Sequence, residues 1–307
     1  MDFRFRIFKF TNPQYIIRNP NSEIIMNAKA SIARLSILSN TLLIIMKLAV
    51  GLISGSVSIL SEAIHSSMDL IAAVIAFFSV RVSDNPPDSR HPYGHGKIEN
   101  ISGVIESILI FIAAIWIIIE AVKKLLGERI ELESITLGSL VMLISAVVNI
   151  FVSRRLYKVA HETKSVALEA DALHLKTDVY TSLGVAIGLG LIILTGINWL
   201  DPVIAILVAL FIIKEAYQLL HKAFTPLLDT AWSDNEIDEL ETRLSGLGVS
   251  YHDLRTRVAG NYRFIDIHIQ ISENESVGNA HKYCDKIESM LKSVYENVTV
   301  TIHVEPA

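Results

Sequence analysis

Six long apolar segments dominate the chain between residues 33 and 222, and each has about the 20 residues that a helix needs to cross the hydrocarbon core of a membrane. Because that core offers backbone groups no hydrogen-bond partner, segments of this kind are expected to be helical. They are predicted at about 33–54, 57–82, 98–124, 135–157, 166–195 and 199–221. The sequence therefore predicts an all-α membrane domain of six helices.

The remainder of the chain, from about residue 223, has the composition of a water-soluble domain. Helical periodicity at about 232–247 and 277–294 is interleaved with stretches that alternate between apolar and polar residues, as half-buried strands do. The order helix, strand, strand, helix, strand predicts a small α+β domain with its helices on one face of a sheet. We therefore expect three parts: an N-terminal segment (1–30), a membrane domain (31–222) and a soluble domain (223–307).

Lysine and arginine residues gather in the N-terminal segment and in the loops at about 83–97 and 154–164, whereas two of the opposite loops are short and nearly uncharged. Positively charged loops tend to stay on the cytoplasmic side of a membrane. We therefore expect a multi-pass protein of the cell's inner (plasma) membrane, with both termini in the cytoplasm. The basic and aromatic N-terminal segment is expected to lie on the membrane surface.

Two of the apolar segments carry a histidine and an aspartate four residues apart: His65 with Asp69, and His174 with Asp178. Residues at this spacing share one face of a helix, and ionisable groups inside a span by default mark function. A single pair would also fit an ordinary hydrogen-bonded contact, but two pairs with identical spacing favour one ion held between two helices. Two imidazoles and two carboxylates suit tetrahedral Zn²⁺ and also accept Co²⁺, Cd²⁺ or Fe²⁺.

Further histidines lie outside the apolar segments. In the loop DSRHPYGHGK, Asp88, His91 and His95 suit a second ion with water as the fourth ligand, although incidental loop histidines are the alternative. The soluble domain holds four of the chain's ten histidines, and each of them alone is more typical of a plain surface or core residue. Together they indicate a metal cluster, formed from His252, His268, His281, His303 and the neighbouring Glu305.

Composition excludes several classes of protein. Cys284 is the only cysteine, which excludes an intramolecular disulfide and a cysteine-based zinc site. A formal net charge of −5 gives no sign of nucleic-acid binding. An intramembrane metalloenzyme is disfavoured, because four protein ligands leave no open position for a catalytic water and His161-Glu162 does not begin an HExxH motif. We expect the protein not to be an enzyme.

The pieces HSSMD, HPYGHGKIE, EADALHLKTD and HDLRTR occur in this order on a chain with six predicted spans. In these pieces the chain resembles the cation diffusion facilitator family of divalent-metal/proton antiporters, over about residues 30–305. The resemblance is closest to bacterial and archaeal members with a ferredoxin-like (metallochaperone-like) cytoplasmic domain. It implies a homodimer that exports zinc or a similar ion and is driven by the proton gradient.

Carried over by position, the resemblance implies three metal sites. His65 stands where many relatives with mixed zinc and iron specificity have aspartate, which favours zinc over manganese because imidazole suits zinc. Glu305 stands where a close relative would have aspartate. The implied sites are a transport site (His65, Asp69, His174, Asp178), a loop site (Asp88, His91, His95) and a binuclear cytoplasmic site (His252, His268, His281, His303, Glu305), with an interlock between protomers made by Lys97 and Asp229.

Two questions stay open at this point. A membrane-bound zinc sensor without flux would use the same soluble domain, although an intact intramembrane tetrad argues for transport. Iron, cobalt, cadmium or manganese as the main substrate is the other alternative. Asp171 fits the family pattern without being a predicted ligand, and we interpret it as a neighbour of the site or a member of a proton pathway.

Overall fold

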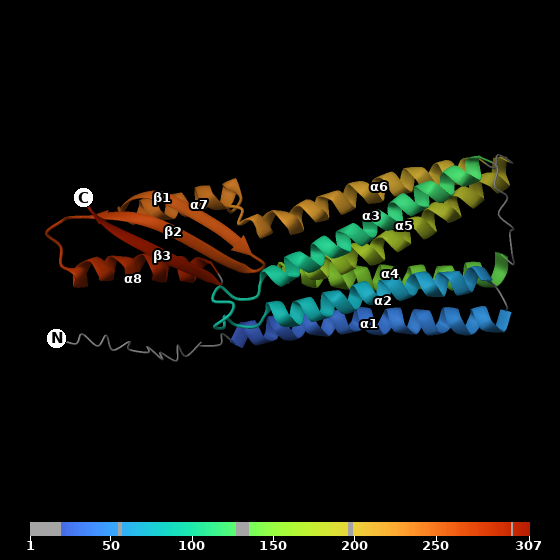
Figure 1. Ribbon diagram of the computed structural model, residues 1–307, viewed down its shortest axis with the longest axis horizontal. Helices are drawn as coiled ribbons and strands as arrows, with labels where there is room; N and C mark the ends of the chain where they lie inside the picture. Colours follow the sequence, from blue (N-terminus) through green and yellow to red (C-terminus); the bar gives the residue numbers. More distant parts are fainter. Residues whose placement is uncertain (1–19, 55–56, 127–134, 196–198, 296) are drawn as a thin grey trace, which may run out of the picture.

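The computed structural model describes residues 20–54, 57–126, 135–195, 199–295 and 297–307 (Figure 1). Most of the predicted N-terminal segment lies outside these ranges. Six helices precede the soluble part, as predicted: α1 (Pro20–Ser54), α2 (Val57–Ser83), α3 (Lys97–Leu125), α4 (Ile135–Thr163), α5 (Val166–Thr195) and α6 (Leu200–Phe224). The helix α1 begins at Pro20, before the predicted start near residue 33, because apolar content marks only the part of a helix that lies in lipid.

Within the described residues, four helices are long and apolar enough to cross a membrane by length and composition alone: α1, α2, α3 and α6. The described parts of the other two carry more charge: Arg154 and Arg155 lie on α4, and Glu169, Asp171, Lys176 and Asp178 lie on α5. In α5 these groups occupy the first half of the helix, where Asp171 is fully buried. A polar group inside a membrane domain is tolerated on the inner side of a bundle, so α5 belongs to the interior.

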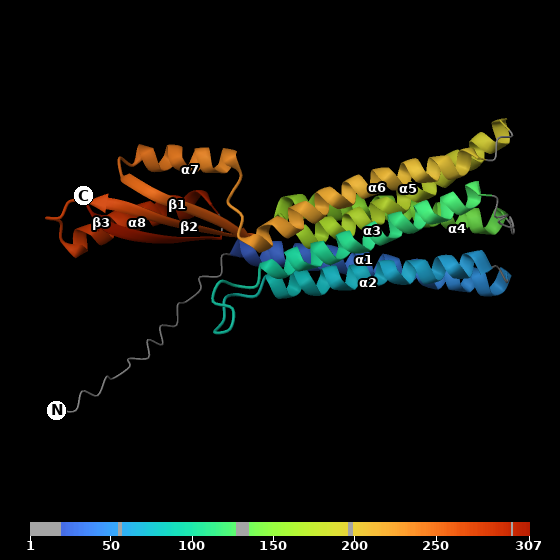
Figure 2. The same ribbon diagram turned by 45° about the horizontal axis from the view of Figure 1, so that its top comes forward.

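The helices pack as neighbours in the pairs α1 with α2, α3 with α6 and α4 with α5 (Figures 1 and 2). Alanines such as Ala33, Ala72, Ala167 and Ala216 are fully buried where helices meet. Small residues let the helix backbones approach closely, which is how helices associate in lipid. Large apolar side chains, Trp116 among them, point outward instead. The outer surface of the bundle is therefore apolar, as a lipid-facing surface must be.

The soluble part begins with a single 3₁₀ turn, η1 (Thr225–Leu228), and matches the predicted order of elements. Its helices and strands are α7 (Asp234–Gly246), β1 (Ser250–Ala259), β2 (Tyr262–Ile271), α8 (Val277–Val294) and β3 (Val298–Pro306). The strand order is β1-β2-β3, in which β2 pairs antiparallel with β1 and parallel with β3. Helix α7 starts with a capping box between Ser233 and Glu236, and Ser276 caps α8.

Both helices of the soluble part cover one face of the sheet. Ile265, Ile267 and Ile269 of β2 form a buried core with Leu240 of α7 and Leu291 of α8. Because side chains alternate along a strand, the residues between these isoleucines face the other way. The uncovered face of the sheet is therefore available for polar side chains.

The loop between α2 and α3 lies at the end of the bundle that meets the sheet (Figures 1 and 2). Gly260, in the turn between β1 and β2, has a φ of +60° and donates its N–H to Asn100 Oδ1 at 3.1 Å. A Cβ atom on Gly96 would lie 2.2 Å from the carbonyl oxygen of Ala259. The two backbones therefore approach too closely for any side chain at either glycine, which fixes the loop against the sheet.

We expect Gly260→Ala to destabilise this junction. The left-handed backbone costs an L-residue at least about 1–2 kcal/mol, and the added Cβ would lie 2.5 Å from the Gly96 carbonyl oxygen. The midpoint of thermal unfolding of the purified protein measures the effect. Gly246→Ala is the matched control, because its Cβ meets nothing within 4 Å. Equal midpoints for the two variants would show that the close approach does not hold the junction.

Candidate metal sites

The predicted intramembrane site brings α2 and α5 together. Asp69 of α2 and His174 of α5 are both buried, and Nε2 of His174 lies 2.9 Å from Oδ1 of Asp69. This separation is close to the roughly 3.3 Å expected between two ligand atoms of a tetrahedral zinc ion. Asp178 follows His174 by about one helical turn and accepts a hydrogen bond from Nδ2 of Asn149 on α4 at 3.3 Å. Three of the four predicted residues thus lie on facing helices in the bundle interior.

The fourth predicted residue, His65, lies on α2 one turn before Asp69. Its side chain lies outside the described part of the structure, so its role remains a prediction. Nδ1 of His174 and Oδ1 of Asn149 are buried and have no hydrogen-bond partner among the described residues. Buried polar atoms nearly always have a hydrogen-bond partner. Unsatisfied polar atoms gathered at one place in a helix bundle are therefore typical of a ligand-binding site.

The sequence alone did not reveal the supports of this site. Asn149 of α4 contacts Asp178. Asn40 of α1 donates to the backbone oxygen of Asp69 at 3.3 Å, and Lys47 donates to Ser66 at 2.7 Å. In the sequence, each of these polar residues lies inside an apolar segment. That position indicates a buried side chain but does not identify its hydrogen-bond partner.

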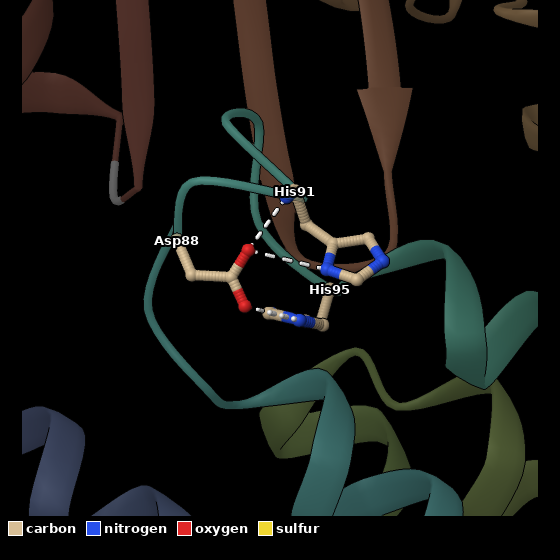
Figure 3. Close-up of side chains that lie close together, drawn as sticks. All are labelled: Asp88, His91 and His95. Carbon is tan, nitrogen blue, oxygen red and sulfur yellow. Dashed lines mark hydrogen bonds and ion pairs between the residues drawn. The ribbon is translucent and has the colours of Figure 1, made fainter.

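The loop residues Asp88, His91 and His95 lie together, with one possible ligand atom from each within 4.8 Å of the others. Figure 3 shows the Asp88 carboxylate between the two imidazole rings: Oδ1 lies 3.2 Å from Nδ1 of His91, and Oδ2 lies 3.5 Å from Nε2 of His95. The backbone N–H of His91 donates to Asp88 at 2.6 Å and holds the pKa of the carboxyl below its usual range, helped by the N–H of Arg90. The carboxylate is therefore ionised and open to a cation at neutral pH.

The uncovered face of the sheet carries the cytoplasmic candidates. The strand pairing places His252 beside His268 and His268 beside His303. Glu305 joins them: its Oε1 lies 3.0 Å from Nδ1 of His268 and 3.6 Å from Nε2 of His303, and its Oε2 lies 3.2 Å from Nε2 of His252. One possible ligand atom from each of His252, His268 and Glu305 lies within 4.8 Å of the others, so these three residues could hold a metal ion.

The structure does not bring the fifth cytoplasmic candidate into this cluster. His281 lies on α8, where it is exposed and sits 3.6 Å from Asp285. Helix α8 packs on the isoleucine face of the sheet, whereas the other four residues share the opposite face. Alternation along one strand places His303 and Glu305 on the same side, but position in the chain did not reveal how the strands pair or on which side of the sheet a helix would lie.

The predicted interlock pair meets within one chain. Nζ of Lys97, at the start of α3, lies 2.9 Å from Oδ1 of Asp229, which follows η1. Arg257 of β1 lies 3.4 Å from the same oxygen. The hydrogen bond from Lys97 lowers the pKa of the Asp229 carboxyl, and the charges of Lys97 and Arg257 add to the effect. The pair therefore connects the bundle to the sheet in addition to the glycine junction.

Comparison with known proteins decides what kind of chain carries these sites. A family model described as "Cation efflux transmembrane domain" matches residues 33–228, and one described as "Cation efflux protein, cytoplasmic domain" matches residues 233–307. The chain belongs to the cation efflux (cation diffusion facilitator) family. Members of this family are integral, multi-pass membrane transporters that export cations, and they are not enzymes. The six-helix transmembrane domain and the α+β cytoplasmic domain match this family's architecture.

Similar proteins cover nearly the whole chain. The "Uncharacterized transporter sll1263" of Synechocystis sp. is 34% identical over 264 residues, which are 85% of this chain and 85% of the relative. The "Cation-efflux pump FieF" of Shewanella oneidensis is 31% identical over 280 residues, which are 89% and 93% of the two chains. The resemblance inferred from four short pieces of sequence is confirmed at the level of the family.

Proposed function

We propose that this chain exports a divalent metal ion, with Zn²⁺ as its main substrate, from the cytoplasm in exchange for protons. The observation that carries the proposal is the buried contact between Asp69 of α2 and His174 of α5, with Asp178 one turn further along. An aspartate and a histidine from two helices are costly inside a membrane domain. A cation that binds both and crosses the membrane accounts for that cost.

The donor set supports zinc. Two imidazoles, from His65 and His174, and two carboxylates, from Asp69 and Asp178, suit a borderline ion such as Zn²⁺ in tetrahedral geometry. Co²⁺, Cd²⁺ and Fe²⁺ accept the same ligands, whereas Mn²⁺ prefers a site made of oxygen atoms. We therefore place zinc first and manganese last among the substrates.

Exchange with protons follows from the chemistry of the ligands. Imidazole and carboxylate bind a metal ion only when deprotonated, so binding releases protons and acid favours release of the metal. The ion would enter from the cytoplasmic side, and the helices would rock around the site to expose it on the opposite side. There a more acidic medium would return protons to the ligands.

The soluble domain would regulate this cycle from the cytoplasm, with both chain termini on that side. We propose that it joins two protomers in a homodimer and binds metal at His252, His268, His303 and Glu305. The loop site at Asp88, His91 and His95 would hold another ion. Metal can bias the transport equilibrium only if it binds one conformation more tightly than the other.

Uptake of different metals into proteoliposomes tests the proposal. With the cytoplasmic face outward and an acidic lumen, we expect accumulation of Zn²⁺, weaker accumulation of Co²⁺ and Cd²⁺, and little Mn²⁺ uptake. Empty liposomes with the same pH gradient are the control. Zinc-dependent dimerisation with no metal uptake would contradict export and favour the alternative, a membrane-bound zinc sensor.

A further inference from the structure

The membrane domain contains buried carboxylates in two different environments. Glu99 of α3 accepts hydrogen bonds from Lys29 at 3.0 Å and from Ser83 at 2.8 Å, and the hydroxyl of Ser165 donates to its other oxygen. A cation and two hydroxyl donors offset much of the cost of keeping this group ionised. Glu99 therefore shows how the fold stabilises a buried negative charge.

Glu106 and Asp171 lack such an environment, although both are fully buried. Oε1 of Glu106 accepts one hydrogen bond, from Ser102 at 3.0 Å. Oε2 of Glu106 has no hydrogen-bond partner in the described part of the chain, and the Ser36 hydroxyl is the one donor that faces Asp171 there. Neither carboxyl forms an ion pair with a lysine or arginine among these residues. An isolated carboxylate in such a place costs so much that it takes up a proton instead.

The two groups lie beside the transport site without belonging to it. Asp171 precedes His174 by one turn of α5, and helix α3, which carries Glu106, packs against α5. Gly103 of α3 meets Val166 of α5, and Ile110 of α3 packs with Ala170 and Leu173. Glu106 lies between Gly103 and Ile110 on the same face of α3, which meets α5 beside Asp171. Neither carboxyl makes a hydrogen bond or ion pair with a predicted ligand in the described residues.

Charged groups on the surrounding helices are engaged elsewhere. On α6, Glu215 faces Lys176 of α5 at 3.6 Å, and Lys222 donates to Glu169 of α5. Lys214 of α6 is exposed. Helix α1 presents Ser36 beside Asp171 and Asn40 beside Asp69. His174 lies one turn from Asp171, and the buried Lys47 of α1 donates to Ser66. A metal ion at Asp69 and His174 would bring two positive charges beside Glu106 and Asp171.

We propose that Glu106 and Asp171 are proton-carrying residues of the transport cycle. This inference rests on the proposed function and adds two groups to it that are not metal ligands. When the site is empty, both carboxyl groups are protonated. When the metal ion binds, its charge stabilises the carboxylates: the O–H bond breaks, the electron pair stays on the oxygen, and the proton leaves to the cytoplasm. Release of the metal on the opposite side reverses the step with a proton taken from that side.

Counting the protons released on zinc binding tests the proposal in the full-length purified protein. In weakly buffered solution, Glu106→Gln and Asp171→Asn are each expected to release up to one proton fewer per zinc bound than the wild type. In transport, each coupled proton contributes about a tenfold change of KM per pH unit, so both variants should show a shallower dependence of KM on pH. Glu120→Gln is the matched control on α3, since Glu120 is partly exposed and pairs with Lys123.

The outcomes separate this inference from the function on which it rests. A wild type that moves zinc without moving protons would contradict the proposed antiport. A wild type that exchanges zinc for protons, with variants that keep its proton count and pH dependence, would overturn the role of Glu106 and Asp171 alone. Infrared difference spectra of the wild type need no variant: zinc binding should remove a band of protonated carboxyl groups, and an unchanged band would also overturn the proposal.

Discussion

Asp69→Asn is expected to lower zinc transport at least about 100-fold. The change removes a charged ligand and leaves His174 beside a neutral amide, at a contact that now measures 2.9 Å. Loss of a group that merely supports a metal ligand already costs about 10–100-fold in metal affinity or activity, and the loss of a ligand should cost more. Initial rates of zinc uptake in proteoliposomes, at several zinc concentrations, measure the effect.

The control for this prediction removes the same charge elsewhere. Asp266 of β2 is exposed on the sheet, so Asp266→Asn changes net charge by the same amount outside the membrane domain. We expect its zinc transport to match the wild type. If Asp69→Asn also transports zinc at the wild-type rate, the ion does not pass between α2 and α5 as proposed.

Lys29→Met is expected to destabilise the membrane domain by about 3–5 kcal/mol. Lys29 of α1 is fully buried. Its Nζ lies 3.0 Å from Oδ1 of Asp84, which follows α2, and 3.0 Å from Oε1 of Glu99 on α3. Without the ammonium group, Glu99 keeps only hydroxyl donors and Asp84 loses its cation. Removing one partner of a buried ion pair leaves the other charge uncompensated. The variant therefore loses more free energy of unfolding than one that lacks a surface ion pair. Thermal unfolding of the detergent-solubilised protein measures it.

Lys292→Met is the matched control for this second variant. Lys292 of α8 pairs with Glu288 one turn away; the Lys292 side chain is exposed and that of Glu288 is partly exposed. Exposed pairs at this spacing contribute about 0.3–0.5 kcal/mol. A Lys29→Met protein that unfolds at the same temperature as Lys292→Met would show that Lys29, Glu99 and the partly buried Asp84 do not hold α1, α2 and α3 together.

The membrane architecture was predictable because lipid allows few solutions. A bilayer forces spans to be helical and to bury their ionisable groups, so apolar segments and the spacing of His174 and Asp178 indicated both the helices and one half of the site. In the soluble domain, alternation of residues along one strand indicated that Glu305 shares a face with His303, and the strand pairing then adds His268. Each of these patterns is local, and each depends on a period that the sequence displays.

Contacts between distant segments were not predictable in this way. Nothing along the chain indicates that Lys29 meets Glu99, or that Gly96 and Gly260 touch, because these contacts depend on how whole helices and the sheet lie against each other. Lys29 falls in the basic N-terminal segment predicted for residues 1–30, and the structure shows it as a buried ion-pair partner on α1, which begins at Pro20. The same reason explains why His281 was grouped with the other cytoplasmic histidines although α8 lies across the sheet from them.

Simultaneous recording of zinc and proton flux in the same proteoliposomes tests the central claim most directly. With the cytoplasmic face outward and an acidic lumen, zinc added outside should accumulate inside while the luminal pH rises, and collapse of the pH gradient should stop the accumulation. The Asp69→Asn protein should show neither flux. Zinc that enters without any proton movement, or that enters equally well through the Asp69→Asn protein, would contradict proton-coupled export through the site between α2 and α5.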